Sequence, residues 1–153
     1  MDFKELLVFV HVLAAIVWVG GSFGFEIIAH RAIKRGGDAG MKAVAQDADA
    51  LGIVFGVSAA LVLGLGIWAV AVHDDVAFSD TWVWLSLIIT AVLFLMGPLF
   101  FMPQGKRLIA DSEAKGGTHP DVVTRAKRVL AVAHVDTAAA LVVVYLMVMK
   151  PGG

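Results

Sequence analysis

Apolar residues run along this chain in four long stretches that polar segments separate. The stretches cover residues 6–29, 51–72, 82–102 and 129–149. Each has the length of about 20 residues that an α-helix needs to cross a bilayer. Within the hydrocarbon the backbone must satisfy its hydrogen bonds inside its own segment, which a helix does. The pattern therefore predicts an all-α fold, with residues 1–153 forming a single integral membrane domain of four transmembrane helices.

The polar segments between these stretches are short, which favours an up-and-down four-helix bundle. Four Lys and Arg residues lie in the loop 30–50 and six in the loop 103–128, out of twelve in the chain. Basic loops are retained in the cytoplasm, so we expect both termini to be extracytoplasmic. The expected location is the cytoplasmic (inner) membrane of a prokaryote. The positive-inside rule already explains why basic residues gather in these loops, so they do not indicate nucleic-acid binding. We expect the lipid bilayer as a partner and no nucleic acid.

Local signals add detail to the four helices. Asp38–Asp49 is expected to form a short helix on the cytoplasmic surface, and Asp121 to cap a helix that runs into the fourth span. Gly97 and Pro98 predict a kink in the third span. Small residues recur every four positions in the second span, at Gly52, Gly56, Ala60 and Gly64. Such a stripe predicts either close packing of helices or a groove for a flat cofactor.

Ionisable residues inside a membrane are costly and mark functional sites. His11 and His73 lie toward the expected outer face, and His30 and His134 toward the cytoplasmic face. Imidazole is a common ligand of metal ions and of haem iron. Two histidines at similar depth on different helices could hold a b-type haem, so the pattern permits one haem or two stacked across the membrane. The alternative for His30 and His73 is a role as interfacial anchors.

The helical period places several polar or aromatic residues of the first span on one face: His11, Trp18, Ser22 and Glu26. This face is expected to point into the bundle. Trp18 is a candidate for packing there or for contact with a cofactor. For Glu26 we expect a partner among Arg31, His30 and a backbone donor.

His134 and Asp136 in the fourth span are two residues apart and therefore point to nearly opposite sides of the helix. Both cannot face one interior. We therefore expect one of them to meet a second protomer or another subunit, in a homodimer or a larger membrane complex.

The absence of cysteine excludes disulfides, iron–sulfur clusters and thiolate metal sites. A copper site remains as an alternative, because thioethers and imidazoles suit Cu(I). Met147 and Met149 lie toward the expected outer face, at a depth similar to that of His11 and His73. The three histidines that could bind a metal are His11, His73 and His134.

The segment His11–Phe23 (HVLAAIVWVGGSF) contains a histidine, six residues, a tryptophan, then small residues and an aromatic one. This pattern resembles the first-helix signature of a superfamily that groups CopD-type copper-resistance domains, the four-helix membrane protoporphyrinogen oxidase and small uncharacterised four-helix membrane proteins. The ending Met149–Pro151 is similar to that of the last group. The resemblance implies a haem- or porphyrin-associated role for His11. The proline–arginine pair that follows this segment in the oxidase is absent here.

These observations predict a membrane haem b protein that serves electron transfer or haem handling. His11 is the expected axial ligand, with His73 or His134 as the second. The alternatives are a protoporphyrinogen oxidase-like enzyme, a copper-binding or copper-transporting membrane protein, and a structural subunit of a membrane complex.

Overall fold

The computed structural model describes residues 2–151, except for the side chain of residue 49. These residues form four long helical rods, two of which contain a short π-helical segment. The rods are α1 (Phe3–Ala15), η1 (Ile16–Gly20) and α2 (Gly21–Arg35); α3 (Asp38–Val72); α4 (Thr81–Met96), η2 (Gly97–Phe101) and α5 (Met102–Lys115); and α6 (Pro120–Met149). Each rod is long and apolar enough to cross a membrane. The predicted all-α fold with four spanning helices is confirmed.

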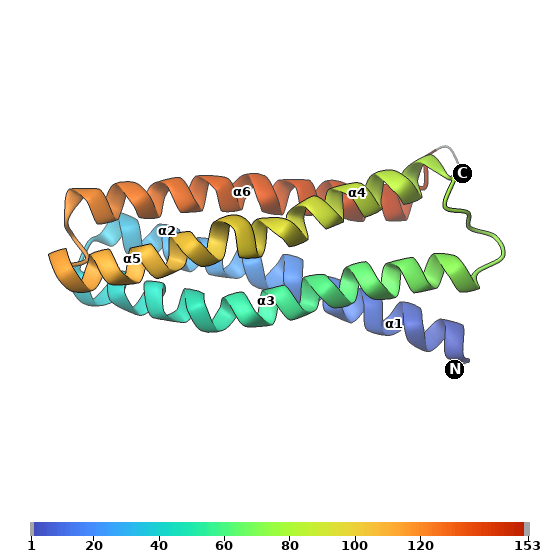
Figure 1. Cartoon of the computed structure of the whole chain (residues 1–153), viewed down its shortest axis with the longest axis horizontal. Coiled ribbons are helices and arrows are strands. Elements are labelled where there is room, and N and C mark those ends of the chain that lie inside the picture. The colour runs from blue at the N-terminus through green and yellow to red at the C-terminus, as the bar shows by residue number, and fades with distance from the viewer. Residues whose placement is uncertain (1, 152–153) are drawn as a thin grey trace.

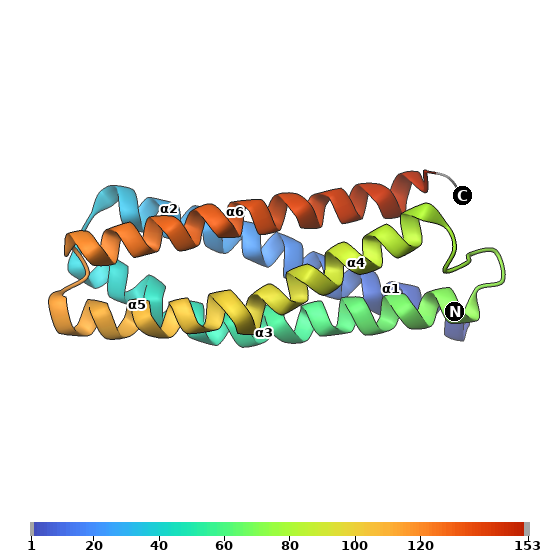
Figure 2. The same ribbon diagram turned by 45° about the horizontal axis from the view of Figure 1, so that its top comes forward.

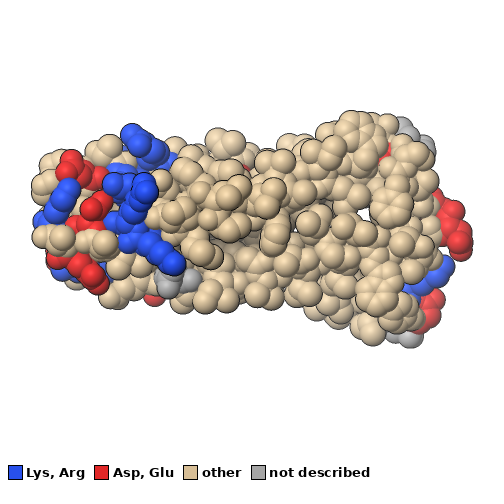
Figure 3. Space-filling view, in the orientation of Figure 1, with Lys and Arg blue, Asp and Glu red and all other residues tan. Residues whose placement is uncertain are grey.

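The four rods run up and down in one elongated bundle (Figure 1). Both chain ends and the loop 73–80 lie at one end of it, which we call the terminal end. The short connections at 36–37 and 116–119 lie at the other end, which we call the basic end. In Figure 3 lysines and arginines gather at the basic end, and the middle of the visible face carries almost no charge. This uncharged middle matches the apolar stretches of the sequence.

Residues from all four rods form the central core. Its buried members are Ala14, Trp18, Ala59, Val62, Leu93 and Ala140. A second apolar cluster closes the basic end with Met41, Ala45, Leu108, Val122 and Ala126. The first two rods approach closely at Gly21, where a Cβ atom would lie 2.7 Å from Cε1 of Phe55. Only glycine fits this position without moving the ring.

Three local predictions differ from the structure or are refined by it. Asp38–Asp49 is not a separate surface helix, because it continues without a break into α3. The α6 helix begins at Pro120 and is capped by His119, whose Nδ1 accepts the N–H of Asp121, so Asp121 is not the cap. At Gly97 and Pro98 the rod passes through the π-helical segment η2. The direction of α4 differs from that of α5 across this segment (Figure 2).

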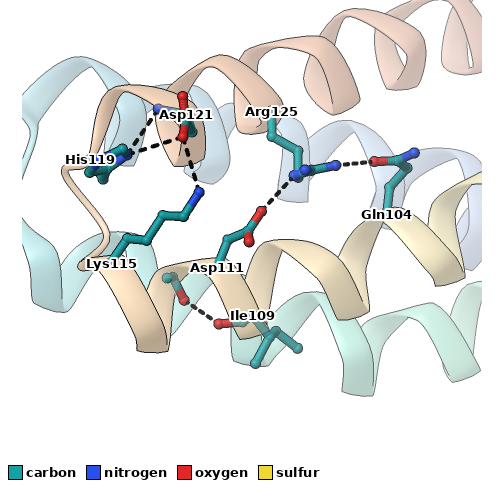
Figure 4. Close-up of polar contacts among 8 residues, drawn as sticks. Gln104, Ile109, Asp111, Lys115, His119, Asp121 and Arg125 are labelled. Atoms are coloured by element: carbon teal, nitrogen blue, oxygen red, sulfur yellow. Dashed lines mark hydrogen bonds and ion pairs between the residues drawn. The ribbon is translucent and has the colours of Figure 1, made fainter.

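Polar contacts tie the helices together at the basic end. Arg125 of α6 donates from Nε to Oδ2 of Asp111 at 3.0 Å and from Nη1 to Oε1 of Gln104 at 3.1 Å. Lys115 donates to Asp121 at 3.0 Å (Figure 4). These contacts fix α5 against α6 where both helices leave the apolar region.

Asp38 connects the two basic-end turns. Its carboxylate accepts the N–H of Gly117 and pairs with Nζ of Lys42 at 2.8 Å. Asp38 precedes the apolar stretch of its helix by about a dozen residues and is exposed. The hydrogen bond from Lys42, followed by the bond from Gly117, lowers the pKa of Asp38. The turn at Gly116 needs glycine, because its φ is +89°.

Candidate functional site

A buried carboxylate joins two helices within the apolar region. Glu26 of α2 is only 5% exposed. One of its oxygens lies 2.5 Å from Nδ1 of His134, and the other accepts a hydrogen bond of 2.5 Å from the hydroxyl of Thr137. The partners of Glu26 are therefore on α6 and are not Arg31, His30 or the backbone, as the sequence had suggested.

The contact with Glu26 sets the orientation of the His134 ring. When Glu26 is a carboxylate it only accepts hydrogen bonds, and Nδ1 of His134 is then the atom that donates. The lone pair of Nε2 is then free for a ligand. Pairing of a carboxylate with the far nitrogen of a ligating histidine is a recurrent arrangement at metal centres, where it fixes the tautomer and raises the basicity of the ring.

His134 and His30 line the same groove between α2 and α6. The side chain of His134 is 53% exposed, so its ring is accessible from this groove. The groove has a volume of about 690 Å³. Its remaining walls are Ile33, Lys34, Lys127, Leu130 and Ala131. An apolar wall, two imidazoles and two lysine ammonium groups thus meet at one place.

The other predicted histidines lie elsewhere. His11 faces α3, where its Cε1 would lie 3.2 Å from a Cβ added to Gly66. His11 and Glu26 are fifteen residues apart on one rod, or about 22 Å along the axis at the α-helical rise. His73 is the C-cap of α3, and its Nδ1 donates to the carbonyl of Ala69 at 2.8 Å. The structure therefore brings His30 and His134 together but does not join His11 to His73 or to His134.

Two further predicted residues have other surroundings. Trp18 is buried in the central core and packs against other helices. Asp136 is partly buried on α6, near enough to Glu26 for their charges to interact, and its Oδ1 has no hydrogen-bond partner. Of the pair that sequence placed on opposite sides, His134 is thus the more exposed and Asp136 the more buried.

Among the described residues, no three His, Asp or Glu side chains converge as a metal site. The glycine stripe of α3 does not pack against another helix of the chain. Gly52, Gly56 and Gly64 are exposed, and a Cβ added to any of them would meet no atom within 4 Å.

Thr137, Lys34 and Lys127 belong to this site but were not singled out from the sequence. Thr137 could have been found, because it follows His134 by three residues and therefore lies near the same face of α6. The two lysines gave no distinct signal among the many basic residues of their loops.

Comparison with known proteins adds the family. Residues 5–151 match the model of a family described as predicted integral membrane protein (DUF2269). No curated protein and no protein of solved structure shows a significant match to the chain.

Proposed function

The chain belongs to the DUF2269 family of predicted integral membrane proteins, and we propose that it is a membrane haem b protein for electron transfer. The observation that carries the proposal is the groove in which His30 and His134 face one space while Glu26 orients His134. This pair replaces the pairs with His11 that the sequence suggested. When bound, the haem would supply a one-electron carrier.

The donor atoms of the groove suit a haem in three respects. Imidazoles from two different helices, His30 of α2 and His134 of α6, would hold the iron, and a haem held by two histidines would supply electron transfer rather than oxygen chemistry. Ile33, Leu130 and Ala131 offer apolar contact to the macrocycle. Lys34 and Lys127 carry positive charge for the propionate groups, and no acidic side chain lines the groove. The carboxylate of Glu26 is held by His134 and Thr137.

We also propose that the basic end faces the cytoplasm of a prokaryote, in its inner membrane. The lysines and arginines gathered at that end support this orientation by the positive-inside rule (Figure 3). The groove then lies in the cytoplasmic half of the bilayer.

Absorption spectra of the detergent-purified protein test the haem proposal. We expect a Soret band in the oxidised protein, a sharp α band after reduction with dithionite, and one haem per chain in a pyridine haemochrome assay. His134→Ala and His30→Ala should each abolish the α band of the six-coordinate form, because each removes one axial ligand.

His11→Ala and His119→Ala are the matched controls, because both remove a histidine that lies outside the groove. Both variants should keep the spectrum of the parent protein. If His11→Ala lost the α band and His134→Ala kept it, the haem would have to lie in the terminal half of the bundle. That result would overturn the assignment of His30 and His134 as its ligands. A parent protein that stays colourless after haem is added would overturn the function itself.

A further inference from the structure

A polar pocket lies between α5 and α6 at the basic end, and it shares no lining residue with the haem groove. Its volume is about 310 Å³, and its walls are Asp111, Lys115, Asp121, Thr124, Arg125 and Arg128. The first two residues belong to α5 and the other four to α6. The four on α6 recur at three- and four-residue spacings and therefore share one face of that helix. In Figure 4 side chains of α5 and α6 point toward one another across this space. We call it the α5–α6 pocket.

The charges of the α5–α6 pocket do not cancel. Arg125 donates to Asp111 at 3.0 Å, and Lys115 donates to Asp121 at 3.0 Å, so each carboxylate has its own cation. Arg128 is the third cation of the lining, and no residue that the structure describes pairs with it. Three cations against two carboxylates leave one positive charge in excess.

The hydrogen-bonding groups of the pocket are out of balance in the same direction. A guanidinium has five N–H donors, and an ammonium has three. Arg125 uses one donor for Asp111 and another for Gln104, and Lys115 uses one for Asp121. The guanidinium of Arg128 and the hydroxyl of Thr124 have no partner within the described part of the chain. The pocket therefore suits a ligand that is negatively charged and rich in acceptor oxygens.

The position of the pocket along the bundle corresponds to the lipid headgroups. Arg128 directly precedes the apolar stretch 129–149 and so lies at the edge of the hydrocarbon. Asp121 is seven residues from Arg128, or about 10 Å along the helix axis, whereas the headgroup layer on one side of a bilayer is about 5 to 8 Å thick. In Figure 3 most lysines and arginines of the basic end lie beside the uncharged middle, and most acidic side chains lie further out. The unpaired donors thus lie at the depth of lipid phosphates.

We propose that the α5–α6 pocket binds the phosphate group of an anionic phospholipid. The phosphodiester carries one negative charge, which equals the excess charge of the lining. Arg128 donates to the phosphate oxygens with its planar guanidinium, a group that pairs with phosphate through two parallel hydrogen bonds. Thr124 donates its hydroxyl from the preceding turn of α6. Lys115 and Arg125 keep their carboxylates neutralised and hold the two helices that form the walls.

Native mass spectrometry of the full-length protein in detergent tests this site. The probes are phosphatidylglycerol, which is anionic, and phosphatidylcholine, which has no net charge. We expect phosphatidylglycerol to bind more tightly. Arg128→Gln should weaken its binding about tenfold or more, because the change removes hydrogen bonds from a charged donor. Thr124→Val should weaken it about fivefold with no change in charge.

Arg107→Gln is the matched control, because it removes the same charge from an exposed residue of α5 that does not line the pocket. It should change the affinity about twofold at most, since salt screens a distant charge. Thr124→Ser keeps the hydroxyl and should keep binding. Equal losses in Arg128→Gln and Arg107→Gln, or equal binding of the two lipids, would show only a solvated basic surface and overturn the site.

Inorganic phosphate distinguishes the two sources of a phosphate group. Added in excess, it should not displace phosphatidylglycerol, because free phosphate has no acyl chains to pack on the neighbouring apolar surface. Displacement that depends on Arg128 would assign the pocket to soluble phosphate and overturn the lipid as its ligand. His134→Ala should bind phosphatidylglycerol like the parent, so failure of the haem proposal and failure of this one are distinguishable.

Discussion

Glu26 keeps a carboxylate inside the bilayer because two donors from α6 satisfy its oxygens. Its partners, His134 and Thr137, are 108 and 111 positions away in the chain. The helical period of the first span placed Glu26 on an inward face, but no periodicity specifies which helix lies opposite. The sequence therefore predicted a buried polar face and could not predict the pair that forms on it.

Replacing Glu26 by Gln tests its role in orienting His134. The neutral amide still bonds to Thr137, but it no longer selects the Nδ1–H tautomer through an ionised acceptor. We expect the haem affinity to fall by about 10- to 100-fold, the usual effect of changing such a partner. Titration of the haem-free protein with haem, followed by absorbance, measures this loss.

Glu113→Gln is the corresponding control, because Glu113 is exposed near the end of α5. An unchanged affinity in Glu26→Gln would show that Glu26 serves only to hold α2 against α6.

At the level of elements, the ends of the helices were harder to predict than their existence. The four apolar stretches all lie within the four rods, yet each rod extends beyond its stretch at the basic end. Polar residues of a helix that leaves the membrane carry no hydropathy signal, so the start of α3 looked like a separate helix. The N-cap at His119 was not predicted, because histidine is an uncommon N-cap residue and the nearby Asp121 is of a preferred type.

The bond between Asp38 and the N–H of Gly117 predicts a pH response of the basic end. Folding lowers the pKa of Asp38, so its carboxylate stabilises the folded protein. This contribution is fully present above the pKa of a free aspartate, about 3.9. It is lost as the pH falls through the lower pKa that Asp38 has in the folded protein. The protection factor of the Gly117 amide, which is its intrinsic exchange rate at each pH divided by the observed rate, should therefore fall in acid. Asp38→Asn keeps only a neutral acceptor oxygen, so it should lower this protection at neutral pH and remove its dependence on acid.

Asp47→Asn provides the control, since Asp47 is an exposed residue of the same helix and lies outside this turn. Slow exchange at Gly117 that persists in Asp38→Asn would contradict the role of the carboxylate.

For the whole molecule, the proposed orientation can be tested because the chain has no cysteine. Single cysteines can therefore be labelled without background. Ser79→Cys lies in the loop at the terminal end and Thr118→Cys in the turn at the basic end; both positions are exposed. A membrane-impermeant maleimide should label Ser79→Cys in intact bacterial cells and Thr118→Cys only after the cells are opened. The reverse pattern would invert the topology.

The π-helical segment η1 has a consequence for how this chain is compared with others. In a π-helix each backbone bond runs between residues i and i+5, so the segment holds one residue more than an α-helical turn would. Deleting one residue from 16–20 would let the segment close into an ordinary α-helix with α1 and α2 near their present relative rotation, whereas the same deletion in a regular α-helix would rotate the flanking parts by about 100°. His11 and Glu26 thus belong to two halves with separate registers. An alignment with an uninterrupted helix needs a one-position gap here, and without that gap Glu26 would be matched to the wrong residue.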